Sequence, residues 1–279
     1  MIIKSQSMNS HPCGFLQVRT SLLPGPLYAF LLLILICCTP KSIENKEDYS
    51  FSKPDEVYEL PGRLKEVSGI AFANDSTLAC VEDEHGIIYL YNLKDKKISR
   101  EIEFASQGDF EDIAIKNDTA YVLRSDGVVT EISNYRSTPE VRELPLELKK
   151  GTEVEGLFYS SANNMLIIAS KSRNSLYSFA LMEGRMIGEP TNIKTNFEFL
   201  PSAVAIHPIT HEYYILSSVR NSLLITSPQG EVLKAIELRG GYFIQPEGIA
   251  FNYSGDLYIC NEGRHGKGNI LMFRYKKDN

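Results

Sequence analysis

The stretch that decides the fold is PEGIAFNYSGDLYICNEGRHGKGNILMFRY, which begins at Pro246 and ends at Tyr275. It contains three apolar segments, GIAF, DLYIC and ILMFRY, and the residues between them are rich in Asn, Ser and Gly. Short apolar segments separated by turn-forming residues are typical of β-strands. The stretch therefore predicts three consecutive strands joined by tight connections.

Four earlier segments repeat this pattern. They are EVSGIAFANDSTLACVEDEHGIIYLYNL from Glu66, FEDIAIKNDTAYVLRSDGVVTEIS from Phe110, VEGLFYSSANNMLIIASKSRNSLYSFAL from Val154 and PSAVAIHPITHEYYILSSVRNSLLITS from Pro201. The aligned positions Gly69, Asp112, Gly156, Ala203 and Gly248 are 43, 44, 47 and 45 residues apart. A period in the forties with several strands per unit is the signature of β-propeller blades.

A fourth strand with alternating residues lies between successive repeats, as in REIEF, VREL and AIEL. The last repeat lacks such a strand, but VYEL at 57–60 precedes the first repeat and fits that role. We therefore predict an all-β fold, a propeller of five four-stranded blades closed by the N-terminal strand, in a single domain over 55–279. A sixth blade would need about 45 more residues, unless 139–153 or 184–200 contains a divergent one.

The N-terminal region has the pattern of a targeting segment. The apolar run LYAFLLLILICC, from Leu27 to Cys38, is shorter than the roughly 20 residues of a spanning helix but has the length of a signal-peptide core. It ends on two cysteines before a polar segment, and this arrangement resembles a bacterial lipobox. We predict a signal peptide over 1–38, lipidation of Cys38 or Cys37, and a polar tether over 39–54. A secretory peptide cut nearby and an uncleaved anchor are the alternatives.

This targeting segment predicts a lipoprotein anchored to a membrane of the cell envelope, on the periplasmic or the cell-surface side. The composition, with 43% hydrophobic and 23% charged residues, excludes a wholly disordered or polytopic membrane protein. Lys and Arg total 29 against 35 Asp and Glu. Binding of nucleic acid depends on a surplus of basic side chains, so we expect no nucleic-acid partner.

Several blade-opening motifs resemble those of the SdiA-regulated domain family. They are VSGIAF from Val67, DFEDIAI from Asp109, VEGLFY from Val154 and QPEGIAFNYSGDLYICNEG from Gln245. The family consists of bacterial envelope propellers in which a Glu-Gly-Ile/Leu-Ala step opens several blades. The resemblance covers residues 57–275 and implies the fold and the compartment, but no activity. The chain departs from the motif in two blades, with Ser68-Gly69 and Ser202-Ala203.

In an antiparallel blade, the start of the first strand and the end of the second lie at the same mouth of the central channel. The strand starts bring Ser68, Glu111, Glu155, Ser202 and Glu247 to this mouth. The second-strand ends bring Glu82, Asp83, Arg124, Asp126, Lys171, Arg173, Arg220, Asn261 and Glu262. We predict that a small ligand binds there through Glu111, Glu155, Glu247, Arg124, Lys171 and Glu262.

Glu111, Glu155 and Glu247 would face one axis, and burying three carboxylates together is costly unless something compensates their charge. Arg124 and Lys171 are candidates to pair with them. A calcium ion is another, because calcium takes six to eight oxygen ligands. In a purely structural alternative, the glutamates accept backbone N–H bonds that hold neighbouring blades together.

Three functional classes follow, and the first is favoured. The first is a binding module without catalytic residues, for a small ligand or an envelope protein. The second is a calcium-dependent hydrolase of lactones or phosphoesters, in which the ion polarises the substrate. The third is a scaffold. His207 follows an inner strand and is expected at the opposite mouth, as a surface residue.

Overall fold

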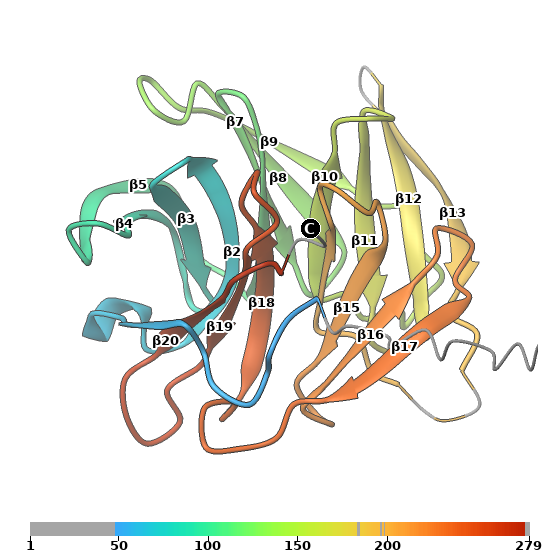
Figure 1. Ribbon diagram of the computed structural model, residues 1–279. Helices are drawn as coiled ribbons and strands as arrows, with labels where there is room; N and C mark the ends of the chain where they lie inside the picture. The colour runs from blue at the N-terminus through green and yellow to red at the C-terminus, as the bar shows by residue number, and fades with distance from the viewer. Residues whose placement is uncertain (1–47, 183–184, 196, 198, 277–279) are drawn as a thin grey trace, which may run out of the picture. The chain divides into compact units, whose positions relative to one another are not determined.

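Five antiparallel sheets of four strands each make up the described part of the chain. The computed structural model describes residues 48–276 apart from 183–184, 196 and 198 (Figure 1). The predicted signal peptide, with Cys37 and Cys38, lies outside the described residues. Among the described residues, no helix is long and apolar enough to cross a membrane.

The strands follow the repeats in chain order. The first blade contains β2 (Val67–Asn74), β3 (Thr77–Glu82), β4 (His85–Asn92) and β5 (Lys97–Gln107). The second contains β6 (Phe110–Lys116), β7 (Thr119–Arg124), β8 (Val128–Ser133) and β9 (Glu140–Pro145). The third contains β10 (Gly156–Ser160), β11 (Met165–Ser170), β12 (Ser175–Met182) and β13 (Arg185–Asn192). The fourth contains β14 (Ala203–Ile206), β15 (Tyr213–Ser217), β16 (Ser222–Thr226) and β17 (Val232–Glu237).

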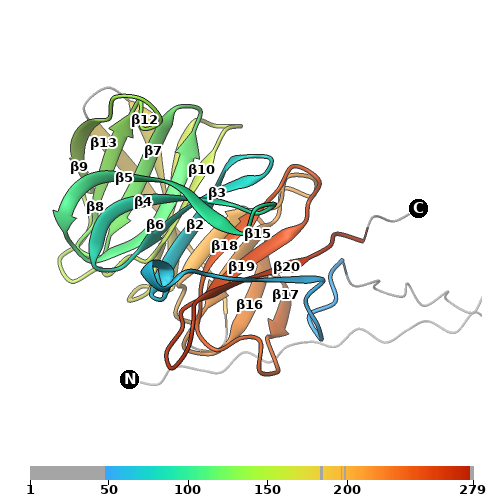
Figure 2. The ribbon, with the colours of Figure 1, turned by 90° about the vertical axis from the view of Figure 1, so that its left-hand side faces the viewer.

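The fifth blade combines both ends of the described chain. It contains β18 (Pro246–Phe251), β19 (Leu257–Asn261) and β20 (Asn269–Phe273), and β1 (Glu56–Glu59) pairs antiparallel with β20. Figure 2 shows the segment before the first blade, in blue, running along β20, in red. One 3-10 turn, η1 (Gly62–Leu64), leads from β1 into β2.

The prediction of five blades is confirmed, and the alternative of a sixth is excluded by where the two candidate segments lie. Residues 140–145 and 185–192 are β9 and β13, the outer strands of the second and third blades. Each pairs only with the third strand of its own sheet within the described chain. Their sequences diverge from the inner-strand pattern because an outer strand packs against one neighbour strand, not against the crowded centre.

The inner strands β2, β6, β10, β14 and β18 come very close to one another at the aligned repeat positions, three of which are glycine. A Cβ atom added at Gly156 would lie 2.8 Å from the Cα of Ala203, in the next blade. One added at Gly248 would lie 3.2 Å from the Cα of Gly69, in the first blade. Figure 1 shows β2, β10 and β18 in the middle of the fold. Glycine is therefore required there by close approach of the backbones.

Apolar side chains fill the space between neighbouring sheets, in five clusters. The cluster between the first and the fifth blade includes Ile70 and Cys80 from the first blade and Cys260 and Ile270 from the fifth. Both cysteines are free and fully buried. As the sequence predicts, they act as small apolar residues of the core.

The predicted tether contributes to the core at its end. Tyr49 is 2% exposed, and its hydroxyl donates to the carbonyl oxygen of Gly255 at 2.5 Å. Its ring contacts those of His207, Tyr214 and Tyr275. Packing against the propeller thus begins several residues before position 55, at which the sequence analysis starts the domain.

Candidate functional site

Each inner strand begins with one extra residue that has no partner on the second strand. In the first blade, Val67 lies opposite Glu82 and Gly69 lies opposite Val81, which leaves Ser68 as the extra residue of a β-bulge. The same shift occurs at Glu111 in β6 and at Glu247 in β18. A bulge re-aims the side chain of its extra residue. These positions are the strand starts that the sequence analysis selected.

The third and fourth blades begin in a similar way. The backbone N–H of Glu155 donates to the carbonyl oxygen of Ala169, the residue paired with Gly156. Likewise, the N–H of Ser202 donates to the oxygen of Leu216, which is paired with Ala203. Two successive residues of the inner strand thus face one residue of the second strand. The five repeats therefore present Ser or Glu from equivalent backbone positions.

A pocket of about 160 Å³ lies at the mouth where the inner strands begin. The residues that line it are Glu66, Val67, Ser68, Asp83, Asp109, Glu111, Glu155, Lys171, Ser202, Gln245, Glu247 and Glu262. Seven of these twelve carry a carboxylate and one is a lysine. We call this site the acidic mouth.

Five of the six predicted ligand-binding residues line the acidic mouth, and Arg124 does not. The guanidinium of Arg124 binds Asp126 in a bidentate pair, with N–O distances of 2.9 and 2.8 Å. It also donates to Glu143 on β9, the outer strand of the same blade, at 2.9 Å. The expected pairing of Arg124 with Glu111 or Glu155 was wrong, because Arg124 pairs instead with these two exposed carboxylates.

Lys171 does pair with Glu155, as expected, through an ion pair between Nζ and Oε1. Burial alone would lower the pKa of Lys171, but the bond to Glu155 raises it above its ordinary value. Burial raises the pKa of Glu155, and Lys171 opposes that rise. One of the three inner glutamates is therefore compensated within the protein.

Glu111 and Glu247 are less well compensated. Burial, followed by repulsion from Glu155, raises the pKa of Glu111 to about 8. Burial raises the pKa of Glu247 to about 7, although a hydrogen bond from Gln245 at 2.8 Å acts in the opposite direction. Near neutral pH, these two carboxyl groups hold protons for much of the time. A cation that entered the acidic mouth would compete with those protons.

Gln245 organises one side of the acidic mouth. Its side-chain amide donates to Glu247 and to Glu262, and its amide oxygen accepts from Arg264. The sequence analysis missed Gln245, Asp109 and Glu66. Each lies two residues before a selected strand-start residue and directly ahead of its strand, so the blade spacing that selected Ser68, Glu111 and Glu247 is the signal that would have found them.

Serine side chains make two of the hydrogen bonds that join the blades near this mouth. Ser68 Oγ donates to the carbonyl oxygen of Phe110 at 2.8 Å, and Ser202 Oγ lies 3.4 Å from that of Pro246. Among the described residues, none of the three glutamates accepts a backbone N–H. The structural alternative, in which backbone N–H bonds to the glutamates hold the blades together, thus has no support; the bond that Glu247 makes to the fourth blade comes from the side chain of Ser218.

The described residues contain no group of three or more His, Cys, Asp and Glu side chains positioned to hold a metal ion. Glu111, Glu155 and Glu247 share a pocket, with Lys171 bound to one of them. Calcium binding through these three glutamates stays a prediction.

The profile of the SdiA-regulated family matches residues 46–264. The chain belongs to the SdiA-regulated family. This match confirms the resemblance found in the blade-opening motifs and covers most of the residues that form the propeller.

Solved structures with the same fold are distant in sequence. Glutaminyl cyclase of Myxococcus xanthus is 14% identical with a TM-score of 0.62, and the match covers 81% of this chain and 97% of that one. A luciferin-regenerating enzyme is 10% identical with a TM-score of 0.52, covering 78% and 95%. A streptogramin B lyase is 11% identical with a TM-score of 0.50, covering 78% and 97%. At such identities the likeness shows the fold alone. No curated protein matches the chain in sequence.

Proposed function

We propose that this member of the SdiA-regulated family is a binding module of the cell envelope, whose acidic mouth captures a small molecule through a positively charged group. The observation that carries the proposal is the excess of carboxylates at this pocket, seven against a single lysine. Burial makes that excess costly, and an entering ammonium or guanidinium group relieves it. A concave polar pocket of this kind is the default binding site of a propeller.

The raised pKa values of Glu111 and Glu247 give the binding a distinct pH dependence. A cation binds best to ionised carboxylates, so both groups release protons when it enters. Affinity for an ammonium group therefore rises between pH 6 and pH 8.5, and protons appear in solution. A neutral ligand of the same shape has neither property.

Titration calorimetry of the purified full chain with n-butylammonium, and with n-butanol as the neutral analogue, tests this proposal. We expect saturable binding of the amine only, with a heat that depends on the ionisation enthalpy of the buffer. Glu247→Gln should weaken binding about tenfold, the loss of one charge-assisted contact of about 1.4 kcal/mol. Glu231→Gln is the matched control, because Glu231 is exposed and binds Lys194 away from the pocket. Equal binding of amine and alcohol would overturn the proposal.

A second candidate is a hydrolase of lactones or phosphoesters that uses calcium at the same mouth. It is favoured by one observation: carboxyl groups with pKa values of about 7 and 8 suit general acid–base catalysis near neutral pH. Thermal unfolding in EDTA and then in millimolar calcium tests the ion. A ligand present at one hundred times its dissociation constant adds about 2.7 kcal/mol to the stability. If calcium does not raise the Tm, the calcium site is rejected. Hydrolase assays are worthwhile only if calcium raises the Tm of the wild type and not that of Glu111→Gln.

The envelope location rests on the N-terminal sequence. The apolar run 27–38, which ends in Cys37 and Cys38, supports lipidation at Cys38 and attachment to a membrane. Metabolic labelling with an alkyne fatty acid should mark the chain and the Cys37→Ala variant, but not Cys38→Ala. If Cys38→Ala is labelled as strongly as the wild type, Cys38 is not the lipidated residue and the lipoprotein assignment at Cys38 is wrong. An envelope protein is the other partner class, detected by crosslinking in intact cells.

We also propose that β1 closes the propeller, so that the first and the last strand of the described chain belong to one blade. The pairing of β1 with β20 and the burial of Tyr49 support this. Closure of this kind covers the edge of β20 and gives the last blade a fourth strand, as in the other blades.

A further inference from the structure

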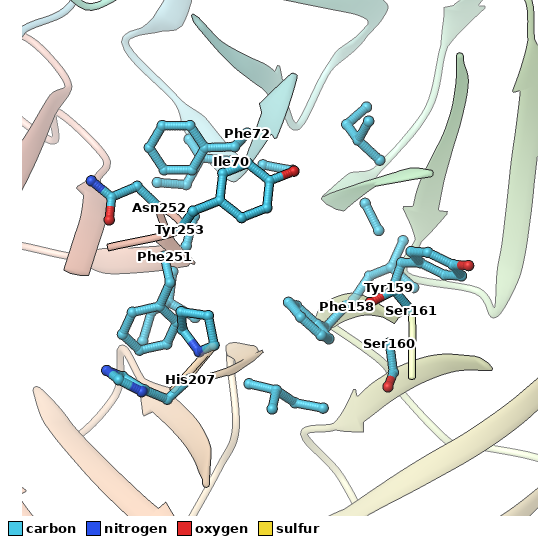
Figure 3. Close-up of a pocket in the computed structure, with 18 of the residues that line it drawn as sticks. Ile70, Phe72, Phe158, Tyr159, Ser160, Ser161, His207, Phe251, Asn252 and Tyr253 are labelled. Atoms are coloured by element: carbon cyan, nitrogen blue, oxygen red, sulfur yellow. The ribbon is translucent and has the colours of Figure 1, made fainter. Parts of the chain in front are cut away.

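A second and larger cavity, of about 380 Å³, lies at the opposite mouth of the propeller, where the inner strands end. It shares no lining residue with the acidic mouth. Three alanines of the inner strands, Ala71, Ala114 and Ala250, line it together with larger aromatic residues. We call this space the aromatic cavity (Figure 3).

Phe158 makes the aromatic cavity asymmetric. Ala71, Ala114, Ala205 and Ala250 occupy the second position after the small residue of their repeats, and the third blade has Phe158 there. Figure 3 shows Phe158 on one side of the cavity and Phe251, from β18, on the other. The ring of Phe158 therefore occupies space on one side of the cavity that an alanine would leave open.

The described residues that line the cavity include no carboxylate, lysine or arginine, and the side chains there that ionise near neutral pH are two histidines, His207 and His211. His207, expected on the surface, is fully buried instead, and its Nδ1 accepts the N–H groups of Ile209 and Thr210 at 3.2 and 3.0 Å. Burial lowers the pKa of His207 to about 4, so the ring is neutral at physiological pH. A charged ligand would lose its hydration here without gaining a counter-charge.

Behind the aromatic cavity, the inner strands that surround the channel come very close together. At the level of Gly156 and Ala203, neighbouring inner strands approach so closely that an added Cβ atom would overlap the next backbone. Asp112, at the same level of its repeat, is 2% exposed. A long acyl chain needs a deep tunnel, whereas a compact flat molecule fits a space closed at this depth.

Tyr253 offers an aromatic surface at the rim. Its side chain is 84% exposed, in a turn whose geometry is fixed by Asn252. The Asn252 Oδ1 accepts the N–H groups of Ser254 and Asp256 at 3.0 and 2.8 Å. An exposed tyrosine held by an ordered turn over an apolar cavity is suited to stack on a ligand.

From this geometry we propose that the aromatic cavity binds an uncharged, planar aromatic molecule of one or two rings, between Phe158 and Phe251 and under Tyr253. The volume lies in the range of small-molecule sites, which bury most of a ligand in apolar and aromatic surroundings. This site is independent of the acidic mouth, in both its residues and the charge it accepts.

Fluorescence titration of the purified full chain with 2-naphthol tests the proposal. The chain contains no tryptophan, so the probe can be excited without interference from the protein. We expect saturable binding at one site. Decahydro-2-naphthol is similar in size but not planar, and naphthalene-2-sulfonate is planar but charged. Both should bind at least tenfold more weakly. If decahydro-2-naphthol binds as tightly as 2-naphthol, the ligand need not be aromatic and the proposal is wrong. If naphthalene-2-sulfonate binds as tightly, the ligand need not be uncharged and the proposal is equally wrong.

Two variants locate the probe. Ala71→Phe fills the cavity and should abolish binding, while Tyr253→Ala changes only an exposed side chain and should weaken binding about tenfold. Tyr242→Ala is the matched control, because Tyr242 is exposed on a loop outside both pockets. Glu247→Gln should leave naphthol binding unchanged. Retained affinity in a folded Ala71→Phe and in Tyr253→Ala would place the probe elsewhere and overturn the site.

Discussion

Ser68 and Glu111 occupy the same position in neighbouring blades, each as the extra residue of the bulge at which an inner strand begins. The short side chain of Ser68 bonds to the carbonyl oxygen of Phe110, in the next blade. The longer side chain of Glu111 lines the acidic mouth, where burial raises its pKa. One backbone geometry thus serves stability when the residue is serine and the candidate site when it is glutamate.

This relationship predicts how Glu111 affects stability as the pH changes. Its pKa is about 8 in the folded chain against an ordinary 4.5, so the folded chain binds the proton more tightly. The free energy of unfolding therefore falls as the pH rises from about 4.5 to about 8. Glu111→Gln removes this contribution, and its Tm should match that of the wild type at pH 5 and exceed it at pH 8.5. Calorimetry at both pH values measures the difference.

Glu231→Gln, an exposed substitution away from the pocket, should leave the slope of Tm against pH unchanged. If Glu111→Gln and the wild type lose stability equally between pH 5 and pH 8.5, Glu111 is ionised in the folded chain. The competition between protons and a cation at the acidic mouth would then lose its basis.

Ser68→Ala should destabilise the propeller by about 1 kcal/mol, because the buried carbonyl oxygen of Phe110 loses its hydrogen bond from Ser68 Oγ. For a domain of this size, that is a decrease in Tm of about 2–4 °C. Ser137→Ala is the control, since Ser137 is exposed and bonds only within its own turn. Equal Tm values for the two variants would show that the bond between the first two blades contributes nothing.

Asp112 joins the second blade to the third. It is buried, and its two carboxyl oxygens accept the N–H of Ile113 at 2.8 Å and that of Leu157 at 2.7 Å. Asp112→Ala leaves both N–H groups buried without an acceptor, at about 1–3 kcal/mol each. Asp112→Asn keeps one acceptor oxygen and should lose less. Urea unfolding of both variants measures the two losses of stability. Equal stability of Asp112→Asn, Asp112→Ala and the wild type would contradict the role of Asp112 in joining the two blades.

The repeat made most of the fold predictable. Gly69, Gly156 and Gly248 recur at blade spacing because neighbouring backbones nearly touch there, and a regular physical constraint leaves a regular pattern. The mouth at which Glu111, Glu155 and Glu247 meet follows from the same repeat and from antiparallel pairing. Regular spacing thus sufficed for blade number and for the location of the acidic mouth.

The repeat does not indicate which of several nearby side chains a residue pairs with. Arg124 has several carboxylates within reach, and its selection of Asp126 and Glu143 depends on distances that spacing does not encode. The bulge adds one residue to a strand, and alternation of side chains cannot locate such a shift in advance. Phe158 replaces the repeated alanine in one blade only. The spacing of the repeats therefore does not predict the aromatic cavity, which depends on how the side chains pack.

The thiols of Cys80 and Cys260 should be inert in the folded protein. Both are fully buried in one apolar cluster, and burial raises the pKa of each thiol. A chain in which Cys13, Cys37 and Cys38 are replaced by Ser should therefore show no rapid reaction with a disulfide reagent, and two reactive thiols in urea. Rapid reaction of one thiol without denaturant would mean that the space between the fifth and first blades opens readily.

The pairing of β1 with β20 predicts different effects for proline at adjacent positions. The N–H of Leu60 donates to the oxygen of Gly268 at 2.8 Å, and hydrogen-bonded pairs alternate along an antiparallel ladder. Tyr58, opposite Ile270, therefore donates to β20, whereas the N–H of Val57 faces away. If β1 closes the ring, Tyr58→Pro should lower the Tm by several degrees more than Tyr58→Ala, which removes only the side chain. Val57→Pro should change it little, since proline is tolerated on an outward edge. Equal Tm values for Tyr58→Pro and Tyr58→Ala would mean that the ladder between the ends of the chain does not stabilise the propeller.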